Sequence, residues 1–308
     1  MQGLRILVTG AAGLIGRAVT PLLRAEGFSV IPFDLRAEPP RDVTSAETLQ
    51  RGLQDIDGII HLAGVSRVID GERDPDRCRR TNVEATRTLL RLAAQRDRVP
   101  WFIQGSSREV YGQQHLLPVA EDAPLAPRNV YARSKVEVER LTNEARAGGM
   151  TTAILRFSNV FGDILDHADR VVPAFAHAAA SGGTVRVDGA DCTFDFTHVS
   201  DVSDGILRVV RRLCDGERAL PPIHFVAGRQ TSLGQLAELA INLGTGVKRV
   251  EAPARNFDVH KFYGDPDRAE ALLGWRAMTP LEAGFARLVE DYRLAMRATA
   301  PVTAPARD

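Results

Sequence analysis

The chain of 308 residues is 44% hydrophobic and 25% charged, and its 39 lysines and arginines balance 39 aspartates and glutamates. This balance excludes a general electrostatic attraction to nucleic acid or to an anionic membrane, so any anion must be recognised locally. The length suggests one large domain or two fused ones. Because three scattered cysteines suit neither a disulfide framework nor a metal site, we expect a reducing compartment. No segment is apolar for long enough to form a signal peptide or a transmembrane helix, so we expect a cytoplasmic protein.

The first half of the sequence alternates short apolar runs with segments of helical spacing. Nearly unbroken apolar runs of this length are typical of strands buried on both faces of a sheet. The alternation predicts parallel strands joined by right-handed crossovers, and hence a doubly wound α/β sheet of the Rossmann type. Thr44 and Glu47 have the spacing of a capping box at a helix start. The expected strands cover 6–8, 30–33, 59–62, 101–103 and 153–155, and the expected helices cover 14–24, 82–94 and 130–147.

The pattern loosens after about residue 159, where we expect a smaller lobe of mixed α/β structure. The chain then divides into a first domain over 1–158, to which later segments return, a lobe over 159–297 and a tail over 298–308. The tail is expected to be disordered because it combines prolines and small residues without periodicity. The lobe is expected to contain helices over 171–180, 202–212, 233–243, 266–273 and 280–295, and a strand over 184–187.

Three glycines at three-residue spacing lie between the first expected strand and the first expected helix. Gly10 permits a tight turn, Gly13 lets the backbone approach a pyrophosphate, and Gly16 allows close packing of the helix on the strand. The helix N-terminus that follows attracts phosphate groups. A plain turn is the alternative for a glycine triplet alone, but its place between a strand and a helix indicates a dinucleotide site.

Asp34 ends the second expected strand, about 18 residues past Gly16. A carboxylate at that place accepts hydrogen bonds from a ribose 2′-hydroxyl and repels a 2′-phosphate. The predicted cofactor is therefore NAD. Arg36, two residues further on, leaves NADP as the alternative.

Tyr131 and Lys135 are four residues apart within a helical pattern, so both project from one face. A nearby ammonium group stabilises a phenolate and lowers the pKa of the tyrosine, which makes it a usable base near neutral pH. An exposed tyrosine beside a solvated lysine is the alternative, but the nucleotide-binding half upstream favours the base. Ser107 follows the strand over 101–103, so its hydroxyl is expected near the carboxyl edge of the sheet, where open α/β sheets bind ligands.

The glycine spacing and the YARSK sequence over 131–135 together resemble the extended short-chain dehydrogenase/reductase family. The similarity is to its nucleotide-sugar epimerase/dehydratase branch, which includes the UDP-glucose 4-epimerases, and it covers nearly the whole chain. Further segments that resemble this branch, in the same order along the chain, are 57–64, 81–83, 105–112, 156–162 and 272–275. The resemblance implies an NAD-binding first domain, a mainly substrate-binding lobe, and cofactor contacts by Gly10, Ala12, Gly13, Leu14, Ile15, Gly16, Asp34, Leu35, Asp42, Val43, Leu62, Ala63, Gly64, Asn82, Tyr131, Lys135 and Phe157.

The resemblance also implies roles for the segment that follows the fourth expected strand. Ser107 would hydrogen-bond the reacting hydroxyl and relay its proton to the tyrosine, and Ser106 would bind substrate beside it. Glu109 matches an acid that assists carbon-acid chemistry in dehydratases and decarboxylases of the family. Because Arg108 stands where dehydratases usually have aspartate, 4,6-dehydration is disfavoured, and a Glu109 paired with an arginine is an equal alternative. His61 is expected to pack beneath the cofactor without a chemical role.

Members of this branch bind the diphosphate of a nucleotide sugar through an asparagine and two arginines. Asn159 matches the asparagine, and Arg255 lies in a segment that resembles the one carrying the first arginine. Phe194 stands where the second arginine usually precedes an Asp-aromatic pair. The alternative source of the positive charge that the second arginine would provide is Arg170 or another basic residue.

The resemblance therefore predicts an NAD-dependent nucleotide-sugar epimerase that inverts C4 through a transient 4-keto intermediate and regenerates its cofactor in place. The alternatives are a dehydrogenase or reductase of a free sugar, sugar acid or polyol, a decarboxylase or dehydratase, and a non-catalytic dinucleotide sensor. The expected partner is a small-molecule substrate rather than nucleic acid or a membrane. The resemblance also implies a homodimer formed through the helices over 82–94 and 130–147.

Overall fold

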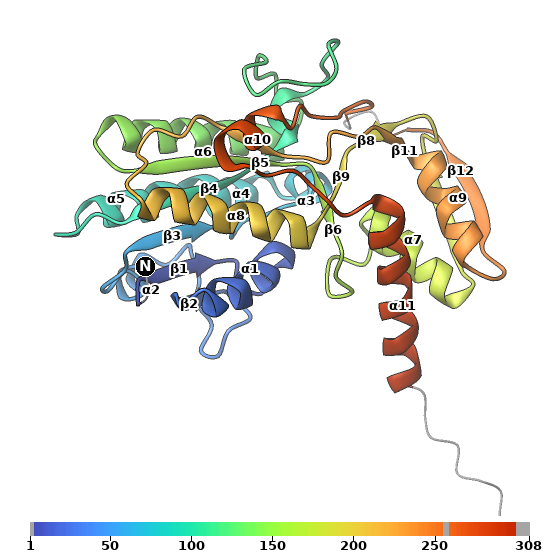
Figure 1. Ribbon diagram of the computed structural model, residues 1–308, viewed down its shortest axis with the longest axis horizontal. Helices are drawn as coiled ribbons and strands as arrows, with labels where there is room; N and C mark the ends of the chain where they lie inside the picture. Colours follow the sequence, from blue (N-terminus) through green and yellow to red (C-terminus); the bar gives the residue numbers. More distant parts are fainter. Residues whose placement is uncertain (1–2, 255–258, 300–308) are drawn as a thin grey trace, which may run out of the picture.

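Six parallel strands form the central sheet of the computed structural model, which describes residues 3–254 and 259–299 (Figure 1). The strand order is β2-β1-β3-β4-β5-β10, so it reverses between β1 and β3. The predicted doubly wound sheet is thereby confirmed, and all five predicted strands belong to it. Side chains along β3, β4 and β5 are buried throughout, because helices cover both faces. The strands are β1 (Arg5–Thr9), β2 (Ser29–Phe33), β3 (Gly58–His61), β4 (Trp101–Ser107), β5 (Thr152–Phe157) and β10 (Ile223–Phe225).

Two layers of helices enclose this sheet (Figure 1). One layer buries Val19, Leu23 and Ile206 against the sheet. The opposite layer is centred on Leu49 and Leu89, which are fully buried. The first layer consists of α1 (Leu14–Ala25) and α8 (Val199–Cys214), and the second of α2 (Ala46–Gly52), α5 (Ala85–Ala94) and α6 (Val130–Ala147).

The helix predicted over 82–94 has a more complex start than its sequence suggested. It begins as a π-helical segment, η1 (Arg79–Glu84), which continues directly into α5. Two short helices precede it, α3 (Val68–Arg73) and α4 (Pro75–Cys78). Single π-helical turns inside helices are frequent at functional sites.

The capping box predicted for Thr44 and Glu47 is wrong. The cap of α2 is instead Ser45, whose hydroxyl oxygen accepts a hydrogen bond from the N–H of Thr48 at 3.3 Å. Both Thr44 and Ser45 are suitable cap residues, and the helix starts one residue later than the box requires.

Most of the remaining elements build a smaller lobe on the right of Figure 1. Its helices pack around an apolar core of their own that includes Phe175, Leu236 and Phe285. Three two-stranded sheets join β6 to β9, β7 to β12 and β8 to β11. Outside this lobe, α8, β10 and α10 pack on or beside the central sheet. The further elements are η2 (Arg108–Tyr111), β6 (Asn159–Phe161), α7 (Val171–Ser181), β7 (Thr184–Asp188), β8 (Thr193–Phe194), β9 (Phe196–His198), β11 (Thr231–Ser232), α9 (Leu233–Leu243), β12 (Lys248–Ala252), α10 (Asp267–Leu273) and α11 (Leu281–Thr299).

The tail predicted over 298–308 lies mostly outside the described residues. Its first two positions, 298 and 299, belong to α11. The helix therefore extends two residues beyond the predicted end of the lobe. The division of the chain into two domains at residue 158 stays a prediction.

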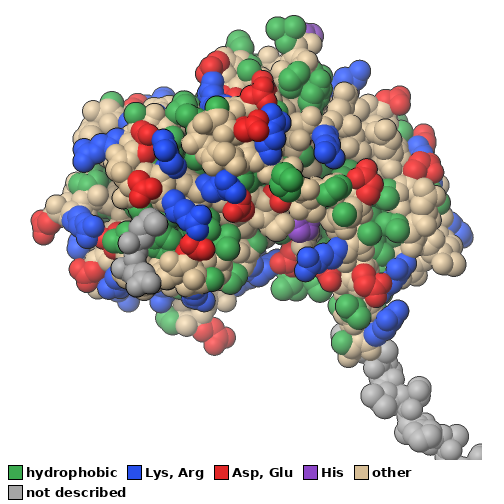
Figure 2. Space-filling view, in the orientation of Figure 1, with side chains coloured by type: hydrophobic (Ala, Val, Ile, Leu, Met, Phe, Trp, Pro, Cys, Tyr) green, Lys and Arg blue, Asp and Glu red, His purple; other side chains and the backbone are tan. Residues whose placement is uncertain are grey.

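Basic and acidic side chains are interspersed on the face of the molecule shown in Figure 2, in keeping with the zero formal net charge of the sequence. Within residues 3–254 and 259–299, no helix has the length and apolar character needed to cross a membrane.

A buried ion pair ties the central sheet to α6. Arg156 of β5 places Nε and Nη2 at 2.9 and 2.7 Å from the two carboxylate oxygens of Glu139 on α6. At the end of β4, the hydroxyl of Ser106 donates to the same carboxylate at 2.5 Å. Nη1 of Arg156 also donates to the hydroxyl of Tyr111 at 2.6 Å. This hydroxyl lies 2.6 Å from Nε2 of His224. Because buried charges persist only when paired and hydrogen-bonded, this network fixes the ends of β4 and β5 relative to α6.

Replacement of Glu139 by glutamine is expected to lower the free energy of unfolding by roughly 3–5 kcal/mol, because it leaves the buried Arg156 without its counter-charge. Urea denaturation measures this change. Glu144→Gln is the matched control, since Glu144 lies on the same helix but pairs with Arg140 at the exposed surface. The control should lose less than about 1 kcal/mol. Equal unfolding midpoints for the two variants would show that the buried pair does not have this structural role.

Candidate functional site

A cavity of about 1390 Å³ lies at the carboxyl edge of the sheet and extends to the lobe. β1 and β3 end there, at the point where the strand order reverses, which is where open α/β sheets bind ligands. A pocket for one small molecule typically has roughly 300–1,000 Å³, so this cavity has room for two. Most of the predicted site residues line it: Gly10, Gly13, Leu14, Ile15, Gly16, Asp34, Leu35, Asp42, Val43, Leu62, Ala63, Gly64, Ser106, Ser107, Glu109, Tyr131, Lys135, Phe157 and Asn159.

Three predicted site residues are not in the described cavity wall. Arg255 lies outside the described residues. The amide of Asn82 is buried behind the wall, where it donates to the carbonyl of Val65 at 3.1 Å and accepts from the N–H of the same residue at 2.8 Å. Ala12 donates its N–H to Asp34 at 3.0 Å. Asn82 and Ala12 therefore shape loops of the cavity, and a direct contact with the cofactor stays a prediction for both.

The glycine-rich loop has the tight turn at Gly10 and the close packing at Gly16 that its sequence predicted. Gly10 has a φ of +70°, and a Cβ on it would lie 2.7 Å from the backbone nitrogen of Ala63. A Cβ on Gly16 would lie 2.2 Å from the carbonyl oxygen of Gly10. Gly13 is the N-cap of α1, and no side chain of the described residues caps this helix start. The first N–H groups of α1 are therefore suited to bind a phosphate, as a dinucleotide site requires.

Asp34 connects the end of β2 to the glycine-rich loop. Its Oδ2 accepts the N–H of Ala12, and its Oδ1 accepts the N–H of Arg36 at 2.9 Å. The guanidinium of Arg36 is 3.9 Å from the same carboxylate and largely exposed. Each carboxylate oxygen can accept more than one hydrogen bond, so Asp34 can still bind a ribose hydroxyl while it supports the loop.

Ser107, Tyr131 and Lys135 lie together in the cavity wall. Tyr131 and Lys135 project from the first turns of α6, whose start is capped by Asn129 through the N–H of Ala132 at 2.8 Å. The Lys135 ammonium lies 5.8 Å from the centre of the Tyr131 ring and donates to the carbonyl of Gly105 at 2.9 Å. A hydroxyl, a phenol and an ammonium group thus meet at the edge of the sheet.

The electrostatics of this group differ from the prediction. Burial raises the pKa of Tyr131 to about 12, while the hydrogen bond with Ser107 and the charge of Arg170 lower it. Burial also lowers the pKa of Lys135 to about 8. In the protein without cofactor, the prediction that Lys135 brings the pKa of Tyr131 toward neutrality is therefore wrong. Desolvation of the phenolate outweighs the effect of the charges around it.

Glu109 is held in an ion pair rather than left as an open acid. Its Oε1 lies 2.8 Å from Nη2 of Arg108, and Asn129 donates to its Oε2 at 3.2 Å. Both members of the ion pair are buried. The alternative of a glutamate paired with an arginine is thereby confirmed.

His61 is buried at the end of β3, and burial lowers its pKa to about 3. Its two ring nitrogens lie 2.7 Å from the hydroxyl of Thr9 and 2.9 Å from that of Thr86. The hydroxyl of Thr9 also accepts the N–H groups of Leu62 and Ala63, both at 3.2 Å. His61 therefore orients a loop of the cavity as a neutral side chain. Sequence analysis missed Thr9, since its partners lie more than 50 residues away.

Ser106 and the lobe residues complete the cavity wall. Ser106 was predicted to bind substrate, but its hydroxyl proton is donated to the buried Glu139. Asn159 begins β6 and faces the cavity together with Phe194 and Arg170. Arg170 also donates to the hydroxyl of Ser66 at 2.9 Å.

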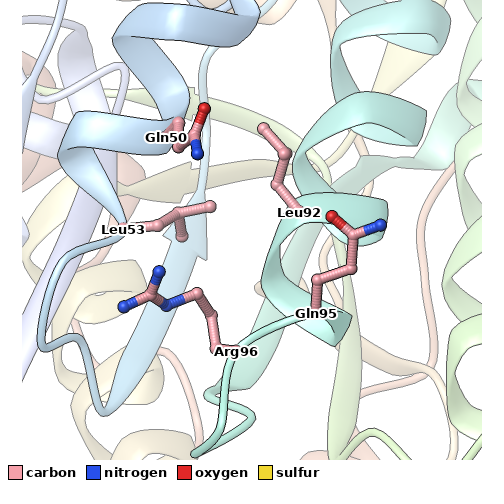
Figure 3. A pocket seen from close by; sticks show the side chains of 5 residues that line it. All are labelled: Gln50, Leu53, Leu92, Gln95 and Arg96. Carbon is pink, nitrogen blue, oxygen red and sulfur yellow. The ribbon is translucent and has the colours of Figure 1, made fainter.

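A second hollow lies on the outer surface between α2 and α5, away from the glycine-rich loop (Figure 3). It is much smaller, about 150 Å³, and its wall combines two glutamines, two leucines and an arginine. Because these side chains provide neither a nucleophile nor an acid–base pair, the large cavity is the candidate site. The lining residues are Gln50, Leu53, Leu92, Gln95 and Arg96.

Residues 6–228 match the NAD dependent epimerase/dehydratase family. The chain is similar to a UDP-glucose 4-epimerase of Mycolicibacterium smegmatis, with 31% identity over 94% of this chain and 99% of that protein. Two solved structures are also similar. The UDP-glucose 4-epimerase of Thermotoga maritima with UDP-glucose has 26% identity and a TM-score of 0.88, over 95% of this chain and 100% of that one. MoeE5 in complex with UDP-glucuronic acid and NAD has 28% identity and a TM-score of 0.86, over 94% and 99%.

Replacement of Asp34 by alanine is expected to weaken NAD binding roughly 10- to 150-fold, because hydrogen bonds to a charged acceptor are lost. Asp34→Asn is the matched control, since it keeps an oxygen for the N–H of Ala12 but removes the charge that repels a 2′-phosphate. It should lose less NAD affinity and discriminate less against NADP. Calorimetry with both cofactors measures these affinities. Equal affinity of the unmodified protein for NAD and NADP would contradict the role given to Asp34.

Proposed function

The chain belongs to the NAD dependent epimerase/dehydratase family, and from this membership we propose that it is a nucleotide-sugar epimerase that inverts C4 through a transient 4-keto intermediate. One observation carries the proposal: Ser107, Tyr131 and Lys135 share a single cavity with the glycine-rich loop. A hydroxyl placed between the serine and the tyrosine would lie beside the cofactor site. The similar epimerases and the UDP-sugar complex of MoeE5 support a nucleotide sugar as substrate.

Tyr131 is the proposed base for the sugar hydroxyl, and Ser107 hydrogen-bonds the same hydroxyl and relays its proton. With a pKa of about 12, the phenol is protonated at neutral pH until positive charge is added nearby. When bound, NAD would supply a reversible acceptor for the hydride of the sugar C4 and, in its oxidised form, positive charge. By resemblance, Lys135 is proposed to hold the nicotinamide ribose, so this added charge would lie close to Tyr131. The phenolate is therefore favoured in the loaded site.

The residues proposed to hold NAD are those of the glycine-rich loop and the ends of β2 and β3. The cap-free start of α1 fits a pyrophosphate, and Asp34 fits the adenosine ribose. Asn159 and, by resemblance, Arg255 are proposed to bind the diphosphate of the substrate.

Alternative activities receive less support from the site. A dehydratase or decarboxylase that uses Glu109 as an acid would need to break its buried pair with Arg108. A non-catalytic dinucleotide sensor has no use for the Ser107–Tyr131–Lys135 group. A dehydrogenase or reductase of a free sugar, sugar acid or polyol would use the same group, so the fate of the reduced cofactor must decide between it and the epimerase.

We also propose a cytoplasmic homodimer that forms through α5 and α6. The two helices lie side by side on one face of the sheet, where Arg87 and Glu137 approach to 3.4 Å. Cys78 and Cys214 are free thiols, which suits a reducing compartment.

Replacement of Tyr131 by phenylalanine is expected to lower kcat roughly 10²- to 10⁴-fold, the usual contribution of a positioned base. NAD should stay bound, because the ring remains in the wall. Tyr292→Phe is the control, since it removes a phenol from α11 outside the cavity wall and should leave kcat unchanged. Steady-state turnover and the NAD content of each variant are the measurements. A Tyr131 variant with most of its turnover would refute the proposed base.

No net reduction of NAD is expected during turnover, since an epimerase returns the hydride in every cycle. With UDP-glucose or UDP-glucuronic acid as substrate, chromatography should show the C4 epimer while absorbance at 340 nm stays flat. Stoichiometric growth of that absorbance with product would instead identify a dehydrogenase.

A further inference from the structure

Arg108 is a buried cation in the wall of the large cavity and has no role in the proposed epimerisation. Its side chain is 9% exposed, and it lines the cavity directly after Ser107. Nη2 pairs with Glu109 at 2.8 Å. Nη1 is buried and has no hydrogen-bond partner among the described residues.

Two aromatic rings fix the orientation of this guanidinium. Its central carbon lies 4.8 Å from the centre of the Phe194 ring and 5.4 Å from that of Phe262. Stacking on rings stabilises an arginine and holds its plane in place. Nη2 is paired with Glu109, whereas Nη1 is a buried donor group without a partner among the described residues.

A purely structural role accounts for the ion pair and the stacking but not for Nη1. A buried donor without a partner is unfavourable, and native proteins keep few of them. Because Arg108 lines a ligand cavity, an acceptor on a bound ligand is the partner that would satisfy this donor. A guanidinium edge binds carboxylate and phosphate oxygens best.

The position of Arg108 indicates which part of a substrate it meets. Its backbone lies between Ser107, which is proposed to bind the reacting hydroxyl, and Glu109, whose N–H donates to the hydroxyl oxygen of Ser107 at 3.2 Å. Its side chain lines the same cavity as Ser107. A group bound by Nη1 therefore belongs to the sugar end of the substrate rather than to the base of its nucleotide.

We propose that Arg108 is a specificity-determining residue that binds an oxyanion at the sugar end of the substrate through Nη1. The oxyanion is either a carboxylate of the sugar, as in a hexuronic acid, or the phosphate linked to the sugar. Phe194 supports this contact by holding the guanidinium, although it carries no charge itself. The inference rests on the proposed function, since it takes a nucleotide sugar as the ligand.

The test measures binding of UDP, UDP-glucose and UDP-glucuronic acid to the NAD-loaded protein by calorimetry. Arg108→Lys keeps the charge that faces Glu109 but removes the planar fork. If the oxyanion is the sugar carboxylate, this variant should bind UDP-glucuronic acid roughly 10- to 100-fold more weakly and the other two ligands unchanged. If it is the phosphate, binding of all three should weaken by a similar factor.

A double variant, Arg108→Gln with Glu109→Gln, guards against misfolding, because it removes both buried charges together. It should show the same loss, whereas Glu109→Gln alone keeps Arg108 and should bind the favoured ligand at least as tightly as the parent. Arg133→Lys, at an exposed position of α6, should bind like the parent. Parent-like affinities of Arg108→Lys and of the double variant for all three ligands would overturn the inference and leave the proposed function standing. If the parent itself binds none of the three, the inference fails together with that function.

Discussion

The buried pair of Arg156 and Glu139 is the constraint on which the geometry of the site depends. Arg156 belongs to β5, Glu139 to α6, and the hydroxyl of Ser106 at the end of β4 donates to the same carboxylate. The strand that ends at Ser107 and the helix that carries Tyr131 are therefore held by one set of charge-assisted hydrogen bonds. Proton transfer requires the reacting groups to stay within hydrogen-bond reach, so a shift of α6 along the sheet would separate them.

Burial has two effects at this site. It makes the hydrogen bonds of the network strong, because the local dielectric is low. It also raises the pKa of Tyr131 and lowers that of Lys135, since both charged forms lose hydration. The protein groups alone thus favour a neutral phenol, and the proposed chemistry depends on positive charge brought by the cofactor. Such a site would be basic only when it is loaded, which would limit side reactions of the isolated protein.

The features that could be predicted from the sequence are those that depend on residues close together in the chain. The strands were recognisable because unbroken apolar runs reflect burial on both faces, and the glycine-rich loop because Gly10 and Gly16 have no room for a Cβ. Contacts between distant segments were not predictable. Nothing in the sequence near Arg108 indicates that its guanidinium stacks on Phe194, or that Ser106 is bonded to Glu139. The pKa of Tyr131 was mispredicted for the same reason, since its burial depends on the whole fold.

In the proposed reaction, hydride leaves the sugar C4 and returns to the same carbon within one cavity. This transfer is tested most directly with UDP-glucose and UDP-glucuronic acid deuterated at C4, incubated in ordinary water until epimer forms. Mass spectrometry of the separated epimer reports the isotope at C4. The deuterium should be retained, because it is transferred to the cofactor and back without contact with solvent. Replacement of the deuterium by hydrogen from water would rule out this hydride transfer.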